Sequence, residues 1–243
     1  MHNKGCNKGF VHNEARIYKG LYLPLNRTNE SLSNDVDYIQ SSIEQVNSLS
    51  HFCSISKTTR LLDFGCGQGR LSNGFLASKT EIARYIGVDT SLESINWCVN
   101  WIEKYHSNFK FLHVPAYNAR YNPEEKMYQP LPFEENTFDL VFLNSVFSHM
   151  LTADIRFYLE QFKRVLSSGG YVYLTAFIED DVPHEEENPE GYLGRKSKGA
   201  LHRVRFQKNY FLSLVREFGF TVIEFKHQYI TRTCQSVVIL KRN

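Results

Sequence analysis

The chain has 243 residues, with 28 Lys or Arg against 26 Asp or Glu, so its formal net charge is +2. This length suits one α/β domain with a well-buried core and some added segments, and it is short for two full domains. The balance of charge gives no global field that would favour nucleic acid or a membrane surface, so we expect neither as a partner.

Compartment and metal content are predicted from what the sequence lacks. No apolar run reaches the length of a membrane span, and the polar residues 1–6 lack the apolar core of a signal peptide, so we expect a cytoplasmic protein. The five cysteines are scattered, odd in number and never spaced C-x-x-C, which argues against a disulfide framework and a zinc site. We therefore predict reduced thiols and no bound metal.

Residues 1–57 are predicted to be an arm and one helix, on the lid or substrate side of a core formed by residues 58–243. The arm contains Gly, Pro, Asn and scattered aromatic residues without helical or strand periodicity. Its Tyr18, Tyr22 and Arg27 would either close over a ligand or belong to an unstructured end.

The predicted helix runs from Asp35 to about Phe52, where apolar residues recur at helical spacing, with Ser33 or Asn34 as its cap. Beyond it, strand and helix patterns alternate. The predicted strands are Arg60–Gly65, Tyr85–Asp89, Phe109–Val114, Phe138–Asn144, Tyr171–Phe177, Thr221–His227 and Ser236–Lys241. The predicted helices are Gly69–Lys79, Leu92–His106, Thr152–Ser167 and Gln207–Phe218, with a turn at Gly169–Gly170.

This alternation favours an α/β fold with a parallel sheet and helices on both faces. The last two strands are joined by too short a connection for a crossover, so they should pair antiparallel as a hairpin. Two long segments, 115–137 and 178–205, follow predicted strands at the edge where open α/β sheets bind ligands. Loops of this length at that edge are more often functional than idle, so we expect both to line a cleft.

The first strand of the core carries Asp63 and runs into a turn with glycine at three alternate positions, Gly65, Gly67 and Gly69. Glycine takes positive φ without steric cost and lets the backbone approach a ligand closely. A dinucleotide-binding turn has the spacing G-x-G-x-x-G, whereas Arg70 here holds the place of the third dinucleotide glycine. The turn therefore favours an adenosine ligand without a pyrophosphate.

A second strand-end acid strengthens that interpretation. The run R-Y-I-G-V-D ends in Asp89, about twenty residues after the turn, where a parallel strand delivers a carboxylate to ribose hydroxyls. Either acid alone would serve as a helix cap. Their joint placement beside the glycine turn favours a binding site.

The succession of apolar strand, acid, G-x-G-x-G, helix, strand and Asp resembles the class I S-adenosylmethionine-dependent methyltransferases. The likeness runs from about Thr58 to the C-terminus, and the glycine motif is its most specific part. It implies a Rossmann-like, doubly wound, mostly parallel seven-stranded sheet with one antiparallel strand near the edge. It also implies S-adenosyl-L-methionine as cofactor and S-adenosyl-L-homocysteine as product.

The resemblance implies which residues hold each part of the cofactor. Asp63 and the backbone of the turn, including Cys66, would hold the methionine end, and Asp89 with Thr90 would meet the ribose. We interpret Cys66 as a small residue that fills the turn, because no activating base for a nucleophile is visible.

Further along, Ala116, Tyr117 and Asn118 lie where related enzymes contact adenine. An acid is usual there and is missing here, so we expect Asn118 or the backbone to donate and accept hydrogen bonds while Tyr117 stacks. Asn144 and Ser145 follow the fourth strand, where relatives border the sulfonium and the methyl acceptor.

His149 is the candidate general base, because imidazole can take a hydroxyl proton near neutral pH. A histidine at this place in many relatives is instead a packing residue at a helix start, and its apolar neighbours favour that role. His184, His202 and His227 are rivals. His202 and Arg203 would either form a solvated basic face or contact an acidic or sugar-phosphate acceptor. Residues 227–232 would either line an acceptor pocket or form a plain hairpin linker.

Residues 131–142 and 162–170 resemble the small-molecule (type 11/12-like) branch of the family. No N-P-P-Y or D-P-P-Y sequence of base- and amide-nitrogen methyltransferases follows the fourth strand. We therefore expect O-methylation of a small molecule or of a sugar or glycan hydroxyl, since tyrosine-rich loops suit stacking on sugars. The alternative is a cofactor-binding partner or regulatory protein that transfers no methyl group; a nicotinamide-dependent oxidoreductase is disfavoured by Arg70.

Overall fold

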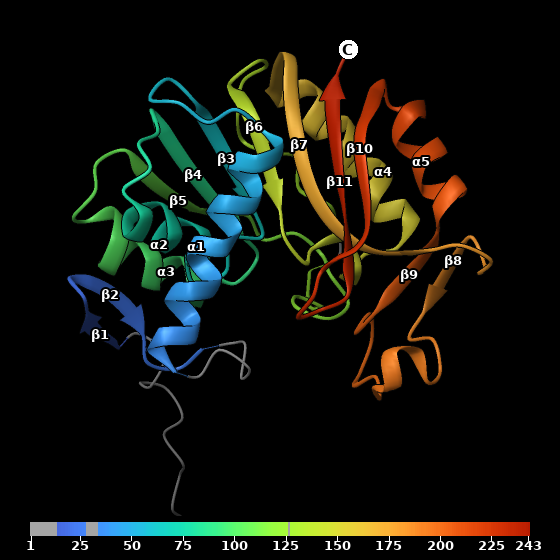
Figure 1. Cartoon of the computed structure of the whole chain (residues 1–243), viewed down its shortest axis with the longest axis horizontal. Helices are drawn as coiled ribbons and strands as arrows, with labels where there is room; N and C mark the ends of the chain where they lie inside the picture. The colour runs from blue at the N-terminus through green and yellow to red at the C-terminus, as the bar shows by residue number, and fades with distance from the viewer. Residues whose placement is uncertain (1–13, 28–33, 126) are drawn as a thin grey trace, which may run out of the picture.

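The computed structural model describes residues 14–27, 34–125 and 127–243, and its centre is a twisted mixed sheet (Figure 1). The strand order is β10-β11-β7-β6-β3-β4-β5, in which β11 runs antiparallel to β7 and β10. The pairs β3–β4, β3–β6, β4–β5 and β6–β7 are parallel. These strands are β3 (Arg60–Phe64), β4 (Arg84–Asp89), β5 (Phe109–His113), β6 (Phe138–Leu143), β7 (Leu166–Glu179), β10 (Phe220–Ile230) and β11 (Gln235–Arg242). The predicted Rossmann-like sheet, with its antiparallel strand near the edge, is therefore confirmed.

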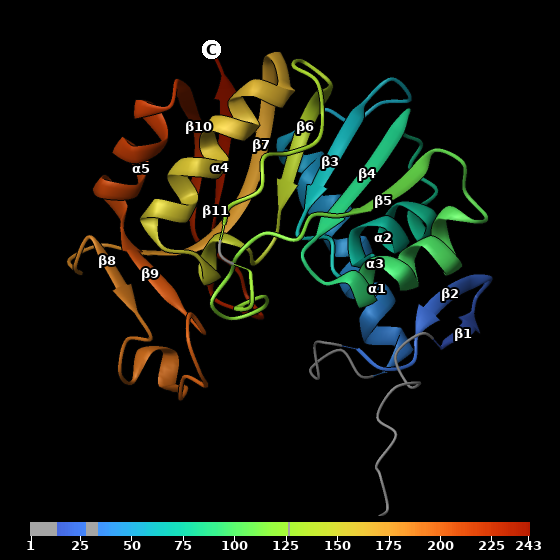
Figure 2. The same cartoon turned by 180° about the vertical axis from the view of Figure 1, so that it is seen from behind.

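Helices cover both faces of the sheet, as predicted (Figure 2). They are α1 (Asp35–Phe52), α2 (Arg70–Ser78), α3 (Leu92–Cys98) with the π-helical turn η2 (Val99–Glu103), η3 (Phe147–His149), α4 (Thr152–Val165) and α5 (Lys208–Glu217). Alternate residues of β6 show the two layers. Val141 and Leu143 belong to the cluster that includes α4 and α5, whereas Leu140 and Phe142 belong to the cluster that includes α1, α2 and α3.

The contact between α1 and α2 is unusually close at Gly74. A Cβ on this glycine would lie 2.2 Å from the backbone oxygen of Ser42 and 2.9 Å from Val46 Cγ2. At the start of α1 the side chain of Asn34 accepts a hydrogen bond from Asp37 N at 2.8 Å, so Asn34 is the cap; Ser33 lies outside the described residues. Helix α1 is thereby fixed against α2, and its N-terminal half lies at the carboxyl edge of the parallel strands (Figure 1).

The N-terminal segment, predicted to lack periodicity, contains a hairpin of β1 (Ala15–Tyr18) and β2 (Leu21–Pro24). Its two-residue turn, Lys19–Gly20, has φ of 49° and 80°, as a type I′ turn requires. Tyr22 packs on Trp101 and Tyr105 with ring centroids 5.0 and 4.9 Å apart. The strands were missed because each has four residues and their aromatic partners come from a distant part of the chain.

The insertion 178–205 also contains regular structure. Strand β8 (Glu185–Glu187) pairs antiparallel with β9 (Val204–Gln207), which pairs parallel with the end of β7. We call residues 180–207 the β8–β9 lobe; it extends the sheet beyond the seven predicted strands and hangs from the ligand edge (Figure 1). The turn predicted at Gly169–Gly170 lies within β7, where the register shifts from Phe138–Leu166 pairing to Leu140–Tyr171 pairing.

A substitution at Gly74 tests the helix contact. Gly to Ala inside a helix is ordinarily stabilising, but here the added methyl meets a backbone oxygen that cannot rotate away. We expect Gly74→Ala to lower the free energy of unfolding by about 1–3 kcal/mol, as overpacking does, in urea unfolding monitored by circular dichroism. The control Ser50→Ala, at an exposed position of α1, should change it by less than about 0.5 kcal/mol. Equal stability of Gly74→Ala and the native chain would contradict the close packing.

Candidate functional site

The three glycines of the turn after β3 all have left-handed backbones, with φ of 81° at Gly65, 51° at Gly67 and 71° at Gly69. The amides of Gly65 and Cys66 donate to Val88 O at 2.8 and 3.0 Å, which fastens the turn to the end of β4. Helix α2 begins directly afterwards at Arg70. The predicted strand–turn–helix arrangement is thus present.

The glycines serve two different purposes. A Cβ on Gly65 would lie 2.5 Å from Val146 Cγ2, and one on Gly69 would lie 2.6 Å from Ile102 Cδ1, so packing forbids side chains there. A Cβ on Gly67 would meet nothing within 4 Å. The backbone at Gly67 therefore borders open space, as expected of a turn that a ligand approaches closely.

Asp89 ties the ends of the two central strands together. Its Oδ2 accepts a hydrogen bond from Gly67 N at 2.7 Å, and its Oδ1 accepts one from Ser91 N at 2.8 Å. Each carboxylate oxygen keeps a further acceptor site, which suits the two hydroxyls of a ribose. Next to it, Thr90 Oγ1 donates to Ala116 O at 3.0 Å, so Thr90 also joins β4 to the loop after β5.

Asp63 lies under the turn and is only 3% exposed. Burial is the main reason that the pKa of its carboxyl is raised to about 7; the hydrogen bond from the Tyr85 hydroxyl and the nearby Arg70 oppose the rise, and the Asp89 charge adds to it. A cationic ligand group above the turn would favour the ionised form. The carboxyl is therefore poised to change protonation when such a ligand binds.

A polar network joins α1, α2 and the residue after β6 beside the turn. With its amide oxygen turned toward them, Gln45 accepts hydrogen bonds from Arg70 Nη2 at 2.8 Å and from Asn144 Nδ2 at 2.8 Å. Arg70 is thus held at the start of α2, where the sequence predicted only that it replaces a glycine. Gln45 was not predicted, because nothing in its helix distinguishes it from a surface glutamine.

Ser145 is held by a second network at the ends of β7 and β11. It has φ of 63°, its amide donates to Thr175 Oγ1 at 2.8 Å, and its hydroxyl accepts from Gln235 Nε2 at 2.6 Å. Thr175 Oγ1 in turn donates to Gln235 Oε1 at 2.5 Å, which closes a ring of three residues that includes the backbone amide of Ser145. The predicted cleft residue Ser145 therefore has a fixed orientation that depends on two residues far along the chain.

The predicted adenine-side residues have different surroundings. Asn118 is buried; its Oδ1 accepts from the amides of Arg120 and Tyr121, and its Nδ2 donates to His149 O at 3.0 Å. Its amide is thus used to shape the loop 115–137 and to attach it to the residues after β6. Ala116 and Tyr117 follow β5 in the chain, and the amide of Tyr117 donates a hydrogen bond to Met127 O.

His149 has the contacts of a packing residue. Its Nδ1 lies 2.9 Å from Leu201 O, so this nitrogen carries the proton, and its ring packs edge-on against Tyr121. Burial, with Arg120 and His202 nearby, lowers the pKa of the imidazole to about 4. The ring is therefore neutral near pH 7, and its role in these contacts is to connect η3 with the β8–β9 lobe.

A cluster that the sequence did not reveal lies at the end of β7. Glu179 Oε1 accepts from Tyr192 Oη at 2.5 Å and from Gln228 Nε2 at 3.0 Å, and Glu179 Oε2 lies 2.6 Å from His227 Nε2. Burial raises the pKa of Glu179, but these three hydrogen bonds together lower it further than burial raises it. Glu179 ends a parallel strand just as Asp89 does, so the same rule could have found it. Of the other rivals, His184 stacks on Tyr210 with centroids 4.6 Å apart.

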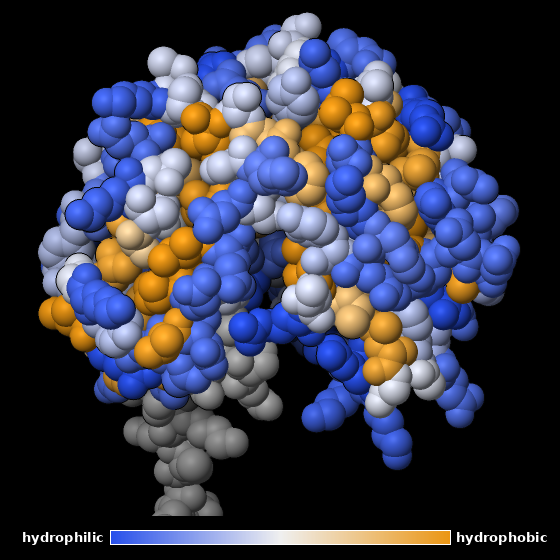
Figure 3. Space-filling view, viewed as in Figure 1, coloured by the Kyte–Doolittle hydropathy of each residue, from blue (hydrophilic) through white to orange (hydrophobic). Residues whose placement is uncertain are grey.

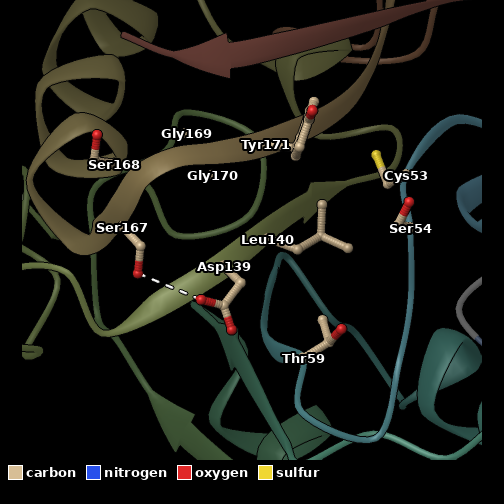
Figure 4. A pocket seen from close by; sticks show the side chains of 10 residues that line it. All are labelled: Cys53, Ser54, Thr59, Asp139, Leu140, Ser167, Ser168, Gly169, Gly170 and Tyr171. Atoms are coloured by element: carbon tan, nitrogen blue, oxygen red, sulfur yellow. Dashed lines mark hydrogen bonds between the residues drawn. The ribbon is translucent and has the colours of Figure 1, made fainter.

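One pocket lies at the opposite edge of the sheet. It has a volume of about 200 Å³ and is lined by residues at the amino ends of β3, β6 and β7, among them Thr59, Asp139 and Ser167 (Figure 4). Asp139 pairs with Arg60 Nη2 at 2.7 Å, and the Arg60 hydrogen bond holds the pKa of Asp139 below its usual range. These groups satisfy one another and lie away from the glycine turn, so this pocket is separate from the candidate site.

The candidate site is instead at the carboxyl edge, where β3 and β6 are neighbours and the chain connections diverge. Figure 3 shows a hollow with largely hydrophilic walls there, between the place of α1 and that of the β10–β11 connection. Open α/β sheets bind ligands at this kind of point. A left-handed glycine turn with a carboxylate on the next strand defines a protein that binds an adenosine-type cofactor.

Comparison with known proteins identifies the family within this class. A family model described as a methyltransferase domain matches residues 62–174. An uncharacterized methyltransferase of Schizosaccharomyces pombe is 34% identical over 118 residues, which is 49% of this chain and 40% of that protein. The match thus spans about two fifths of that relative's length. Residues 62–174 thus belong to the S-adenosylmethionine-dependent methyltransferase family that the sequence predicted.

Solved structures of low identity share the fold. The 1,6-didemethyltoxoflavin-N1-methyltransferase of Burkholderia thailandensis, solved with S-adenosylhomocysteine, has a TM-score of 0.56 at 15% identity and covers 86% of this chain and 80% of its own. Magnesium protoporphyrin IX methyltransferase of Synechocystis, solved with bound S-adenosylmethionine, has a TM-score of 0.57 at 12% identity. The likeness covers 90% of this chain and 86% of that protein. A [4+2]-cyclase has a TM-score of 0.60 at 14% identity, over 84% of this chain and 81% of that protein. These three likenesses show that the chain shares their fold.

Two other features concern metals and membranes. Among the residues that the structure describes, no three His, Cys, Asp or Glu side chains gather in a way that could hold a metal ion. In the same residues no helix is long and apolar enough to span a bilayer. Cys66 is 6% exposed, and burial raises the pKa of its thiol, which agrees with a residue that fills the turn.

Substitutions of Asp89 and Gly67 test the cofactor site. Asp89→Ala removes the acceptor for Gly67 N and the carboxylate that we expect to meet the ribose hydroxyls, and charge-assisted hydrogen bonds contribute about 1.5–3 kcal/mol. We expect S-adenosylhomocysteine to bind about ten- to a hundredfold more weakly in calorimetric titration, and Gly67→Ala to weaken it too. Glu135→Gln, an exposed acid near the opposite edge, is the control. Unchanged affinity in Asp89→Ala, or equally tight binding of NAD, would contradict the assignment.

Asp63 should give the ligand-free protein a particular pH dependence. Its pKa is about 7 in the folded chain against an ordinary 3.8, so between these values the unfolded carboxyl has lost its proton while the folded one keeps it. The free energy of unfolding should therefore decrease as the pH rises from about 4 to about 7 and then change no further on this account. Urea unfolding of the native chain and Asp63→Asn across this range measures the difference. A native chain no steeper than the variant would refute the raised pKa.

Proposed function

We propose that the protein transfers the methyl group of S-adenosylmethionine to a hydroxyl of a small molecule or of a sugar or glycan. Binding of the cofactor is supported above all by the hydrogen bond from Gly67 N to Asp89 Oδ2 at 2.7 Å, which lies beside open space. The cofactor would supply an electrophilic methyl group on sulfur. The fold alone does not determine the reaction, since a [4+2]-cyclase shares it.

The neighbourhood of Ser145 supports a polar acceptor. Ser145, Thr175 and Gln235 form a closed ring of hydrogen bonds at the carboxyl edge, and Asn144 is fixed by Gln45. Side chains held in one orientation can hold an acceptor in line for attack, and positioning contributes on the order of 7 kcal/mol in favourable reactions. The residues N-S-V-F occupy the place where nitrogen methyltransferases often carry N-P-P-Y, which favours oxygen as the acceptor atom.

An aliphatic hydroxyl must also lose its proton as the new bond forms. His149 is poorly suited to accept it, because its pKa is about 4. His227 is better suited, because Glu179 next to its Nε2 at 2.6 Å keeps the proton on that nitrogen and leaves Nδ1 as the acceptor. His227 lies on β10, which pairs antiparallel with β11, and Gln235 at the start of β11 donates a hydrogen bond to Ser145. We therefore propose His227, oriented by Glu179, as the base.

Methyl transfer itself tests the proposed function. The protein is incubated with methyl-labelled S-adenosylmethionine and mixed phenols, sugars and hydroxy acids, and the products are located by mass spectrometry. Label on an oxygen is the expected result. Tight binding of S-adenosylhomocysteine without transfer to any of these acceptors would favour the alternative of a cofactor-binding partner protein, and label on nitrogen would refute O-methylation.

The two histidines should respond differently in this assay. General bases contribute about 10²–10⁴-fold, so His227→Gln should lower kcat at least about a hundredfold. His149→Gln should lower kcat less than about tenfold and lower Tm, because it breaks the contact with Leu201. The reverse pattern would make His149 the base, as the sequence first suggested.

A further inference from the structure

The second half of the β8–β9 lobe is strongly basic. From Gly191 to Gln207 the sequence has five Lys or Arg and no Asp or Glu. A solvated basic face would leave these side chains in water. The structure instead buries one of them, since Arg203 is only 8% exposed.

Arg203 has no carboxylate partner among the described residues. Its Nη1 donates to Arg195 O at 3.4 Å and to Ser197 Oγ at 3.2 Å, both neutral acceptors at long range. A buried guanidinium is normally paired with an acid, because desolvating an uncompensated charge is costly. This position therefore favours an anion, and no acid among the described residues supplies one.

Other basic residues lie near Arg203. Arg120, from the loop after β5, donates through Nη1 to Lys198 O at 3.0 Å, and its buried Nε has no hydrogen-bond partner among the residues that the structure describes. His202 Nδ1 accepts from Lys198 N at 2.9 Å; burial lowers the pKa of this histidine, and Arg203, Arg120 and Lys198 lower it further. We call Arg120, Lys198, His202 and Arg203 the basic cluster. Like charges held together in this way attract an anion.

The three acids of β8, the strand that pairs with β9 directly after Arg203, have other partners. Glu185 accepts from Thr152 N at the start of α4, and Glu186 pairs with Arg205. Glu187 Oε1 accepts from Leu201 N at 2.7 Å and from Asn188 Nδ2 at 3.2 Å. These three carboxylates thus stabilise the lobe and do not form ion pairs with Arg203 or Arg120.

The basic cluster lies beside the reaction site. Leu201, next to His202, accepts from His149 Nδ1, and His149 O accepts from Asn118 Nδ2, two residues before Arg120. His149 ends the short helix that follows Ser145. The cluster therefore lies close to the loop after β5 and the residues after β6. The lobe itself hangs from the carboxyl edge of the sheet (Figure 2).

We propose that the basic cluster binds an anionic group, a carboxylate or a phosphate, on the methyl acceptor. The guanidinium groups of Arg203 and Arg120 present forked donors that match the oxygens of either group. The inference rests on the proposed function and narrows its substrate class, because a neutral sugar would leave Arg203 uncompensated.

Anion binding is tested without knowing the acceptor. Protein saturated with S-adenosylhomocysteine is titrated with sodium phosphate and, separately, sodium benzoate, at constant ionic strength set by sodium chloride, and Tm is followed. We expect a saturable rise of Tm in the native chain. In Arg203→Gln the anion should bind about tenfold or more weakly, as loss of a charged hydrogen bond implies. Arg216→Gln, an exposed arginine of α5, should behave like the native chain.

The outcomes separate the two proposals. Failure to bind S-adenosylhomocysteine would overturn the proposed function, whatever the anions do. If that ligand binds but phosphate and benzoate raise Tm no more than chloride does, or if Arg203→Gln responds like the native chain, the anion site is overturned. Should Arg203→Gln not fold, Arg120→Gln must show the same loss. A stronger response to phosphate than to benzoate assigns a phosphorylated acceptor, and the reverse assigns a carboxylic acid.

Discussion

The candidate site depends on one backbone constraint, the reversal of the chain over the carboxyl end of β3. Three left-handed glycines within five residues turn the chain into α2, and no L side chain fits at Gly65 or Gly69. The same turn presents Gly67 N to Asp89 and the amides of Gly65 and Cys66 to Val88 O. The ends of β3 and β4 are therefore held together by the backbone that borders the ligand, and binding requires little rearrangement there.

Features with a local cause could be predicted from the sequence. The period of the strands, the glycine spacing and the position of Asp89 each follow from neighbouring residues, and the structure has them in the predicted places. The hairpin β1–β2 and the strands β8 and β9 could not be predicted in this way. Their stability comes from distant partners, such as Trp101 for Tyr22 and the end of β7 for β9.

The same division applies to the side chains of the site. Gln45 and Gln235 have no sequence signal, because their importance arises only when α1 and β11 bring them to Asn144 and Ser145. Asn118 had a signal, its place after β5, but its amide is occupied by the loop it shapes. Glu179 had the same signal as Asp89, a carboxylate at the end of a parallel strand, and its environment could be recognised only when β10 placed His227 beside it.

The length of β7 has a mechanical consequence. Its last three residues continue past the common edge of the sheet and pair with β9, whose Val204 and Phe206 are fully buried in the main core. The lobe is consequently an extension of the central sheet and shares its stiffness, unlike a flap on a hinge. An entrance bordered by such an extension would keep one width and one charge, and would select among molecules before any part of the protein moved.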